Sequence, residues 1–245
     1  MAYMWRGVVG VVKPTMHPGS LEEMIRLLPE GIGVIPTTID VRRGETQEFR
    51  DALPSYEEKC ALLAERGVDL IHPEGTPAFM MQGYAGERKL MDLWSERFGA
   101  PCFTSGMTQV EALRALKVTK FIGIRATDWD EGNRTVAGYF TDAGFDVLAI
   151  EKLSVPFQEI GRVSSKEVYA RLKQAFMQHR GANGIHILGS NWRLLDIIRL
   201  LEQDLGVPVV YPVPARCWYI QRRLHINEPR QGCGRLLQDM PALPA

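Results

Sequence analysis

An internal duplication is the feature of this sequence that most limits the folds open to it. Residues 67–76 read GVDLIHPEGT, residues 181–190 read GANGIHILGS, and the two segments align without a gap. The identical pairs are Gly67/Gly181, Ile71/Ile185, His72/His186 and Gly75/Gly189. Two copies predict two similar half-chains, because a solenoid needs three or more stacked units.

Short apolar runs alternate with helical patterns along the chain. The runs are almost continuously hydrophobic, which is typical of parallel strands buried on both faces. The expected strands are 7–12, 31–35, 68–72, 100–103, 121–124, 147–150, 184–188 and 207–211. The expected helices are 20–28, 55–65, 87–98, 108–116, 130–143, 165–179, 191–205 and 215–225.

This alternation fits either one closed barrel or two doubly wound sheets. The offset between the repeat copies divides the chain near its middle, which favours two sheets. We therefore expect an α/β protein with two pseudo-symmetric, doubly wound parallel four-stranded sheets and an active site between them. The first half would comprise residues 1–117 with the C-terminal helix 215–245, and the second half residues 118–214.

Composition excludes several classes of partner. Twenty-nine basic residues balance 29 acidic ones, so no global field favours nucleic acid or an anionic membrane. No apolar run approaches the roughly 20 residues that span a bilayer, and Lys13-Pro14 breaks the N-terminal apolar stretch too early for a signal peptide. The four cysteines lack zinc-site spacing. We expect a cytoplasmic protein with a small-molecule partner, and a homo-oligomer stays an open alternative.

Each copy of the repeat ends in a glycine and a hydroxyl residue, followed by a helical stretch. Gly75-Thr76 and Gly189-Ser190 would thus place backbone N–H groups and a hydroxyl at a helix N-terminus, which suits an anion. Ligands of open α/β sheets bind at the carboxyl ends of strands. We predict one shared site for a small carboxylate, with Pro14, Asn191 and Tyr211 as further binding residues.

Five segments carry a resemblance to a known family. They are VVKP at 11–14, GTP at 75–77, GAPCFTS at 99–105, Asn133, and LGSNWRLLDIIRLLEQDLGVPVV at 188–210. In their order and spacing they resemble the aspartate/glutamate racemase superfamily, in its arylmalonate decarboxylase and maleate isomerase branch. The resemblance implies an enzyme that needs neither a cofactor nor a metal, with its active site between two pseudo-symmetric halves.

The resemblance also implies a catalytic cysteine at the end of the third strand of each half. In racemases and isomerases of this type, either the two thiols exchange a proton at a carbon next to a carboxylate, or one thiolate adds to a double bond. The decarboxylases keep only the cysteine of the second half, which donates a proton. Gly75 and Gly189 occupy the two positions here, and Pro77 lacks the N–H that a serine supplies in the decarboxylases. We therefore expect a retained carboxylate cradle and a proton donor other than cysteine.

Three residues are the predicted catalytic groups. Glu74 has no counterpart in the second copy of the repeat, and a carboxyl group in a dry pocket can have its pKa raised toward neutrality. His72 lies two positions earlier, on the same face of a regular strand, although its repetition as His186 favours a structural role. Asp128 falls near a hydrogen-bonding position of the family, and could instead cap a helix.

Three further residues could supply acid–base or metal-binding groups. His17 and Asp130 follow expected strands, and with His72, Glu74 and Asp128 they could surround a divalent cation. Nothing in their spacing requires this, so the expectation is a site without metal. Cys217 opens the last helix, where a thiol pKa can be lowered, but a small buried hydrophobe is the favoured interpretation.

The leading functional prediction is a cofactor-independent, decarboxylase-type lyase acting on a small di- or oxo-carboxylate. Loss of CO₂ needs one proton transfer, whereas racemisation needs two opposed bases. The alternatives are a cis-trans isomerase or racemase-like enzyme, a hydrolase in which Glu74 or an aspartate activates water with or without a metal, and a non-catalytic carboxylate-binding protein.

Overall fold

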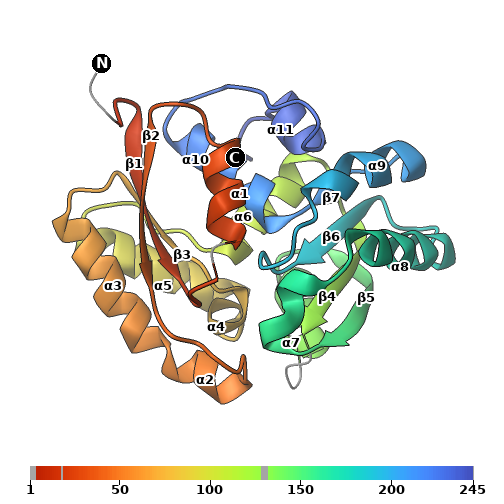
Figure 1. The fold of residues 1–245 in the computed structure, drawn as a ribbon, viewed down its shortest axis with the longest axis horizontal. Coiled ribbons are helices and arrows are strands. Elements are labelled where there is room, and N and C mark those ends of the chain that lie inside the picture. Colours follow the sequence, from red (N-terminus) through yellow and green to blue (C-terminus); the bar gives the residue numbers. More distant parts are fainter. Residues whose placement is uncertain (1–3, 18, 128–131, 245) are drawn as a thin grey trace.

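A computed structural model describes residues 4–17, 19–127 and 132–244 and shows two parallel sheets (Figure 1). The first sheet has the order β2-β1-β3 and the second the order β5-β4-β6-β7. The strands are β1 (Gly7–Lys13), β2 (Ile32–Thr38), β3 (Leu70–Pro73), β4 (Lys120–Thr127), β5 (Asp146–Val155), β6 (Gly184–Leu188) and β7 (Val209–Val210). The predicted α/β class is confirmed.

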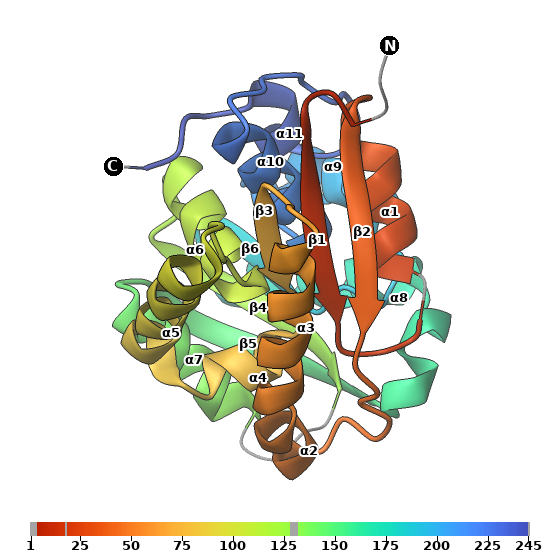
Figure 2. The ribbon, with the colours of Figure 1, turned by 90° about the vertical axis from the view of Figure 1, so that its left-hand side faces the viewer.

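Helices cover both sheets. They are α1 (Gly19–Leu27), α2 (Thr46–Asp51), α3 (Leu53–Glu65), α4 (Thr76–Met80), α5 (Gly83–Phe98), α6 (Ser105–Ala115), α7 (Gly132–Asp142), α8 (Ser165–Gln178), α9 (Leu195–Leu205), α10 (Pro212–Arg223) and α11 (Arg235–Asp239), with a 3-10 turn η1 (Phe157–Arg162). Helix α3 packs on the first sheet (Figure 2), and α8 packs on β4 and β5 of the second. In the described part of the chain, no helix has the length and apolarity to cross a membrane; the cytoplasmic location stays a prediction.

The two halves repeat one topology. In each, the first strand is central and pairs with the second strand on one side and the third on the other. The duplicated segment therefore forms β3 in one half and β6 in the other, and both strands are completely buried. This burial explains why the two runs are continuously apolar, and it brings Gly75 and Gly189 to equivalent strand ends.

The fourth strand expected in the first half does not form. Residues 100–103 make only a single parallel bridge, between Ile71 and Cys102. Ile71 N–H donates to the Pro101 carbonyl at 3.0 Å and Phe103 N–H donates to the Ile71 carbonyl at 3.1 Å. Proline has no N–H to extend the ladder, and Thr104 already caps α6 through Met107 N–H. The first sheet therefore has three strands instead of four.

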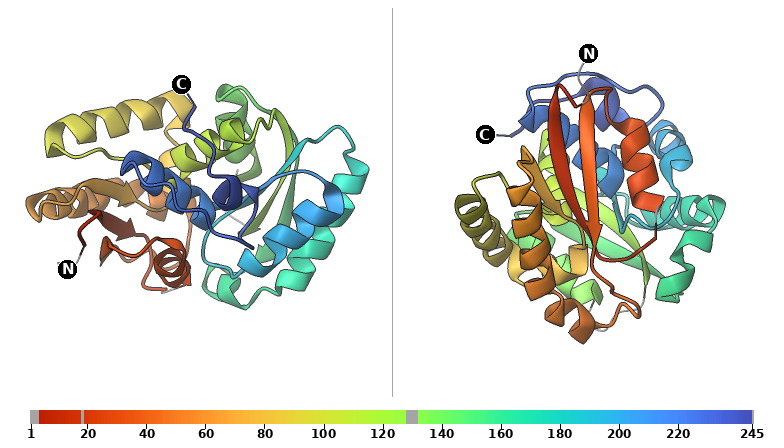
Figure 3. Two further views of the ribbon diagram at one scale, coloured as in Figure 1. Left: turned by 90° about the horizontal axis from the view of Figure 1, so that it is seen from above. Right: turned by 60° about the vertical axis from the view of Figure 1, so that its left-hand side comes forward.

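The C-terminal helices lie near the centre of the molecule. Seen from above in Figure 3, α10 and α11 (blue) lie in the middle of the view, with orange and yellow parts of the first half on one side and the green and teal second half on the other. Helix α10 packs against α1 and α6, which both belong to residues 1–117. This packing agrees with assigning the C-terminal helix to the first half, and the division at residues 117 and 215 stays a prediction.

Candidate functional site

One cavity of about 670 Å³ lies where the two halves meet. Both corners of the duplication line it, Gly75-Thr76 from the first half and Gly189-Ser190 from the second. The remaining lining residues are Pro14, Phe49, Glu74, Pro77, Arg125, Ala126, Phe157, Ile160, Leu188, Asn191 and Trp192. The repeat thus brings residues more than a hundred positions apart to a single pocket.

The two corner glycines have different surroundings. Gly75 has φ +133° and Gly189 has φ +96°, both in the region that favours glycine. A Cβ atom on Gly75 would lie 2.0 Å from the Tyr56 hydroxyl oxygen, whereas one on Gly189 would meet only Trp192 Nε1, at 3.7 Å. The first corner therefore has no room for a side chain, and the second has room but a strained backbone.

Only the first corner starts a helix. Helix α4 begins at Thr76, whereas α9 begins at Leu195, several residues beyond Ser190. Trp192 Nε1 donates to the Gly189 carbonyl at 2.7 Å and so closes a turn where a helix was expected. The predicted helix over 191–205 is therefore wrong at its start, and the second corner offers its N–H groups from a turn.

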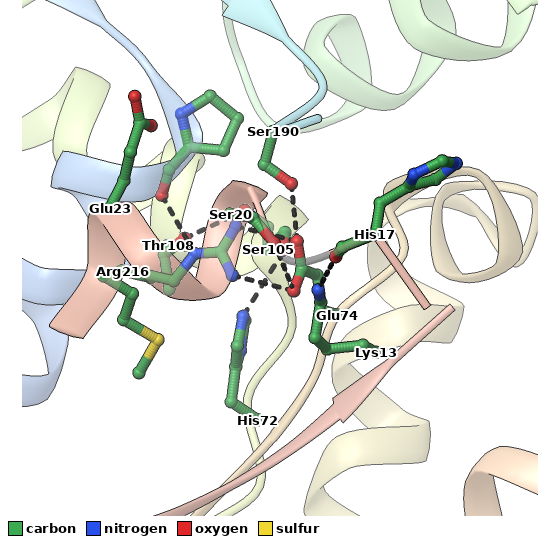
Figure 4. Close-up of polar contacts among 12 residues, drawn as sticks. Lys13, His17, Ser20, Glu23, His72, Glu74, Ser105, Thr108, Ser190 and Arg216 are labelled. Carbon is green, nitrogen blue, oxygen red and sulfur yellow. Dashed lines mark hydrogen bonds and ion pairs between the residues drawn. The ribbon is translucent and has the colours of Figure 1, made fainter. Parts of the chain in front are cut away.

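Glu74 is the centre of a buried polar cluster (Figure 4). Its Oε1 accepts hydrogen bonds from Ser190 Oγ at 2.5 Å and from Arg216 Nη2 at 3.0 Å. Its Oε2 accepts one from Ser20 Oγ at 3.2 Å and lies 3.0 Å from Arg216 Nη1, which forms an ion pair there without hydrogen-bond geometry. Arg216 comes from α10 and is fully buried.

The raised pKa expected for Glu74 is wrong. Burial by itself raises the pKa, but the charge of Arg216 and the hydrogen bonds from Arg216 and Ser190 outweigh it and lower the pKa to about 2. Glu74 is therefore a carboxylate held by its partners, and it has no proton to give near neutral pH.

The contact with Glu74 also changes what Ser190 can do. A hydroxyl has one hydrogen, and Ser190 donates it to Glu74. Ser190 Oγ therefore presents acceptor lone pairs to the cavity, and the donors at this corner are backbone N–H groups. Thr76 keeps its hydroxyl at the opposite corner of the same cavity.

His72 does not line the cavity. It is fully buried, with Nδ1 2.9 Å from the Phe103 carbonyl and Nε2 3.5 Å from Ser105 Oγ. Its counterpart His186 has Nε2 2.5 Å from Gln109 Oε1. Burial lowers the pKa of each histidine to about 3, so both are neutral rings that connect their strand to α6 or to the segment that leads into it.

Only some of the other predicted residues line the cavity. Pro14 and Asn191 line the cavity, but Tyr211 is buried behind it, with its hydroxyl oxygen 2.6 Å from the Trp192 carbonyl oxygen. Asp128 and Asp130 lie outside the described residues. Among the residues that are described, no three of His, Cys, Asp or Glu lie close enough together to hold a metal ion.

His17 and Cys217 were the other two candidates for acid–base chemistry. His17 is exposed, and its carbonyl accepts a hydrogen bond from the buried Lys13 Nζ. Burial lowers the pKa of Lys13, with Glu74 opposing this effect. Cys217 points to the Met24 carbonyl, and burial raises the pKa of its thiol to about 12. The interpretation of Cys217 as a buried structural residue is therefore supported.

Arg125 is the charged lining residue that was not predicted from the sequence. It lies near the end of β4, is 4% exposed, and donates from Nε to Asn133 Oδ1. A single arginine in the otherwise apolar run FIGIRA was the available signal. Phe49, Phe157 and Ile160 supply an apolar part of the lining, here called the apolar wall. A cation, corner N–H groups and an apolar wall together suit a carboxylate with an apolar substituent.

Comparison with known proteins agrees with this arrangement. A model of the arylmalonate decarboxylase family matches residues 9–237. The arylmalonate decarboxylase of Bordetella bronchiseptica is 26% identical over 197 residues, which is 79% of this chain and 82% of that protein. The likeness to enzymes of this kind therefore extends over most of the chain.

Solved structures share the fold. The maleate isomerase Iso from Pseudomonas putida S16 superposes with a TM-score of 0.87 at 17% identity, over 96% of this chain and 99% of the other. A crystal structure of arylmalonate decarboxylase gives a TM-score of 0.79 at 23% identity, over 94% and 98%. Since the family match covers nearly the whole sequence, this chain belongs to the arylmalonate decarboxylase family.

Proposed function

We propose that this protein is a lyase that decarboxylates a malonate-type carboxylate carrying an apolar substituent. The observation that carries the proposal is the cavity shared by the two halves, because its lining includes both corners of the duplication, a buried arginine and several apolar side chains. Membership of the arylmalonate decarboxylase family supports the reaction class.

Each part of the substrate has a matching part of the cavity. Arg125 would bind one carboxylate by charge-assisted hydrogen bonds, and the N–H groups of the corners would bind the carboxylate that remains. The apolar substituent would pack against Phe49, Phe157 and Ile160. Ser190 Oγ, as an acceptor, would face a ligand donor or a bound water.

Decarboxylation breaks the bond between the α-carbon and one carboxylate. CO₂ leaves, and the electron pair of that bond forms an enediolate with the remaining carboxylate. Fixed donors at Thr76 and the second corner would stabilise this charge, an effect worth about 3 kcal/mol for each donor. A proton must then reach the α-carbon to complete the product.

Asp128, with its carboxyl group protonated in the substrate complex, is our proposed source of that proton. Glu74 is unsuitable because its pKa is about 2, and His72 because it is neutral and lines no part of the cavity. Asp128 follows β4 directly in sequence, and Arg125 and Ala126 of that strand line the cavity. Glu74 is proposed instead as a positioning residue that orients Ser190.

Two rival activities fit the cavity less well. Addition of a thiolate, as in a cysteine-dependent isomerase, needs a cysteine in the cavity, and its lining among the described residues contains none. A hydrolase that uses Glu74 to activate water needs a stronger base than a carboxylate with a pKa of about 2. A protein that only binds carboxylates stays the non-catalytic alternative.

A substrate panel tests the proposal. Purified protein is incubated with phenyl- and alkyl-substituted malonates, unsubstituted malonate and maleate, with and without EDTA, and CO₂ release is measured. We expect release from the substituted malonates, unaffected by EDTA, with kcat falling in Asp128→Asn and unchanged in the exposed control Asp142→Asn. Binding without CO₂ release would establish a binding protein, and conversion of maleate without CO₂ release an isomerase.

A further inference from the structure

A second cavity lies beside α1 and the start of α9. It is open to solvent and shares no lining residue with the first cavity. Three arginines line it from three separate segments, Arg26 in α1, Arg193 before α9, and Arg230 after α10. Its acidic lining residues are Glu23 and Asp196.

None of the three arginines is in an ion pair in the described part of the chain, where every ion pair involves other residues. Arg230 donates to the carbonyl oxygens of Leu27 and Leu28, at 3.3 and 3.2 Å, and this fixes its position. Asp196 accepts a hydrogen bond from Ser165 at 2.9 Å. Positive charges gathered in a concavity attract anions and repel one another.

The second cavity is connected to the first through buried groups. Glu23 is 5% exposed and lies between the two, with Oε2 3.1 Å from the Tyr211 hydroxyl oxygen. The same hydroxyl lies 2.6 Å from the carbonyl oxygen of Trp192, which lines the first cavity. One hydroxyl hydrogen serves only one of these acceptors at a time.

Tyr211 is within hydrogen-bond distance of both Glu23 and the Trp192 carbonyl, so a change in the charge of Glu23 would change the balance between these two contacts. Burial raises the pKa of Glu23 to about 7, against the lowering effects of Tyr211, Arg193, Arg216 and Arg26. An anion beside the arginines would offset their charge and favour protonated Glu23, which can itself donate to Tyr211. Tyr211 would then donate to the Trp192 carbonyl. A ligand in the second cavity therefore has a defined route to the wall of the first.

We propose that this second cavity binds a small metabolite through a phosphate or carboxylate group held by Arg26, Arg193 and Arg230. The site is separate from the proposed substrate cavity and does not depend on the proposed reaction. Arginine suits both anions, because its planar donors bind either oxyanion in a bidentate manner.

Calorimetric titration with inorganic phosphate, and separately with malonate, tests this site. The variant is Arg26→Gln with Arg193→Gln, and the control is Arg180→Gln, an exposed arginine outside both cavities. Arg230 is left in place because it holds the C-terminal segment on α1. Thermal unfolding of each variant checks that it is folded.

We expect phosphate to bind the wild type and the control, and to bind the double variant at least about tenfold more weakly, since charge-assisted hydrogen bonds are lost. Tighter binding of phosphate than malonate would identify a phosphorylated ligand, and the reverse a carboxylate. Malonate bound in the first cavity is recognised because Arg125→Met, and not the double variant, removes it. Failure of both probes to bind at millimolar concentration, or equal affinity for the double variant and the wild type, would overturn the proposal.

Discussion

Removing one partner of the buried ion pair between Glu74 and Arg216 should strongly destabilise this protein, and Glu74→Gln tests this. The substitution keeps the shape of the side chain but removes its charge, so the fully buried Arg216 guanidinium loses its counter-ion. Arg216 belongs to α10 and Glu74 follows β3, so the pair also links the C-terminal helix to the first sheet.

Two independent estimates give the same size of effect. Removing one partner of a buried ion pair costs about 3–5 kcal/mol, because the other charge stays buried and uncompensated. The pKa of Glu74 falls from 4.5 to about 2 on folding, which corresponds to roughly 3 kcal/mol. Because the folded-state pKa is the lower one, this stability is present above pH 4.5 and is lost as the pH falls toward 2.

Urea unfolding of the wild type, Glu74→Gln, Arg216→Met and the double variant measures the effect. At pH 7 we expect each single variant to lose about 3 kcal/mol, and the double variant to lose less than the two losses combined. The difference between the wild type and Glu74→Gln should shrink between pH 5 and pH 3. A loss below about 1 kcal/mol at pH 7, typical of an exposed pair, or a loss independent of pH, would refute the reasoning.

Three further outcomes follow from the structure. Chemical unfolding should show that Gly75→Ala destabilises the protein by about 3 kcal/mol or more and Gly189→Ala by about 1–2 kcal/mol. Both substitutions put alanine on a strained backbone, but only the new Cβ at position 75 clashes with Tyr56. Arg125→Met should lower kcat/KM for a substituted malonate about a hundredfold, with stability followed as the control. Burial raises the pKa of Glu87 from 4.5 to about 7, so this residue should lower stability by up to roughly 3 kcal/mol as pH rises from about 4.5 to 7, and Glu87→Gln should remove this part of the pH dependence and leave the similar part due to Glu23.

The repeat itself made most of the fold predictable. Matching GVDLIHPEGT with GANGIHILGS predicted two equivalent halves, and continuous apolar runs predicted buried parallel strands. These inferences depend on local periodicity and on self-similarity, which a sequence displays directly. The missing fourth strand was the exception, because whether residues 100–103 pair along their whole length depends on how Pro101 and the cap of α6 meet β3.

The sequence by itself thus determined the fold class, the two matched corners and the glycine at each of them, since each is written in residue identity and spacing. Only the tertiary structure decided the electrostatics. Arg216 lies 142 positions from Glu74 and reaches it because α10 packs on α1 and α6 of the first half. A pKa depends on the charges and hydrogen-bond donors within a few ångströms. The local sequence therefore suggested that Glu74 is a proton donor, whereas its partners in the folded protein keep it ionised.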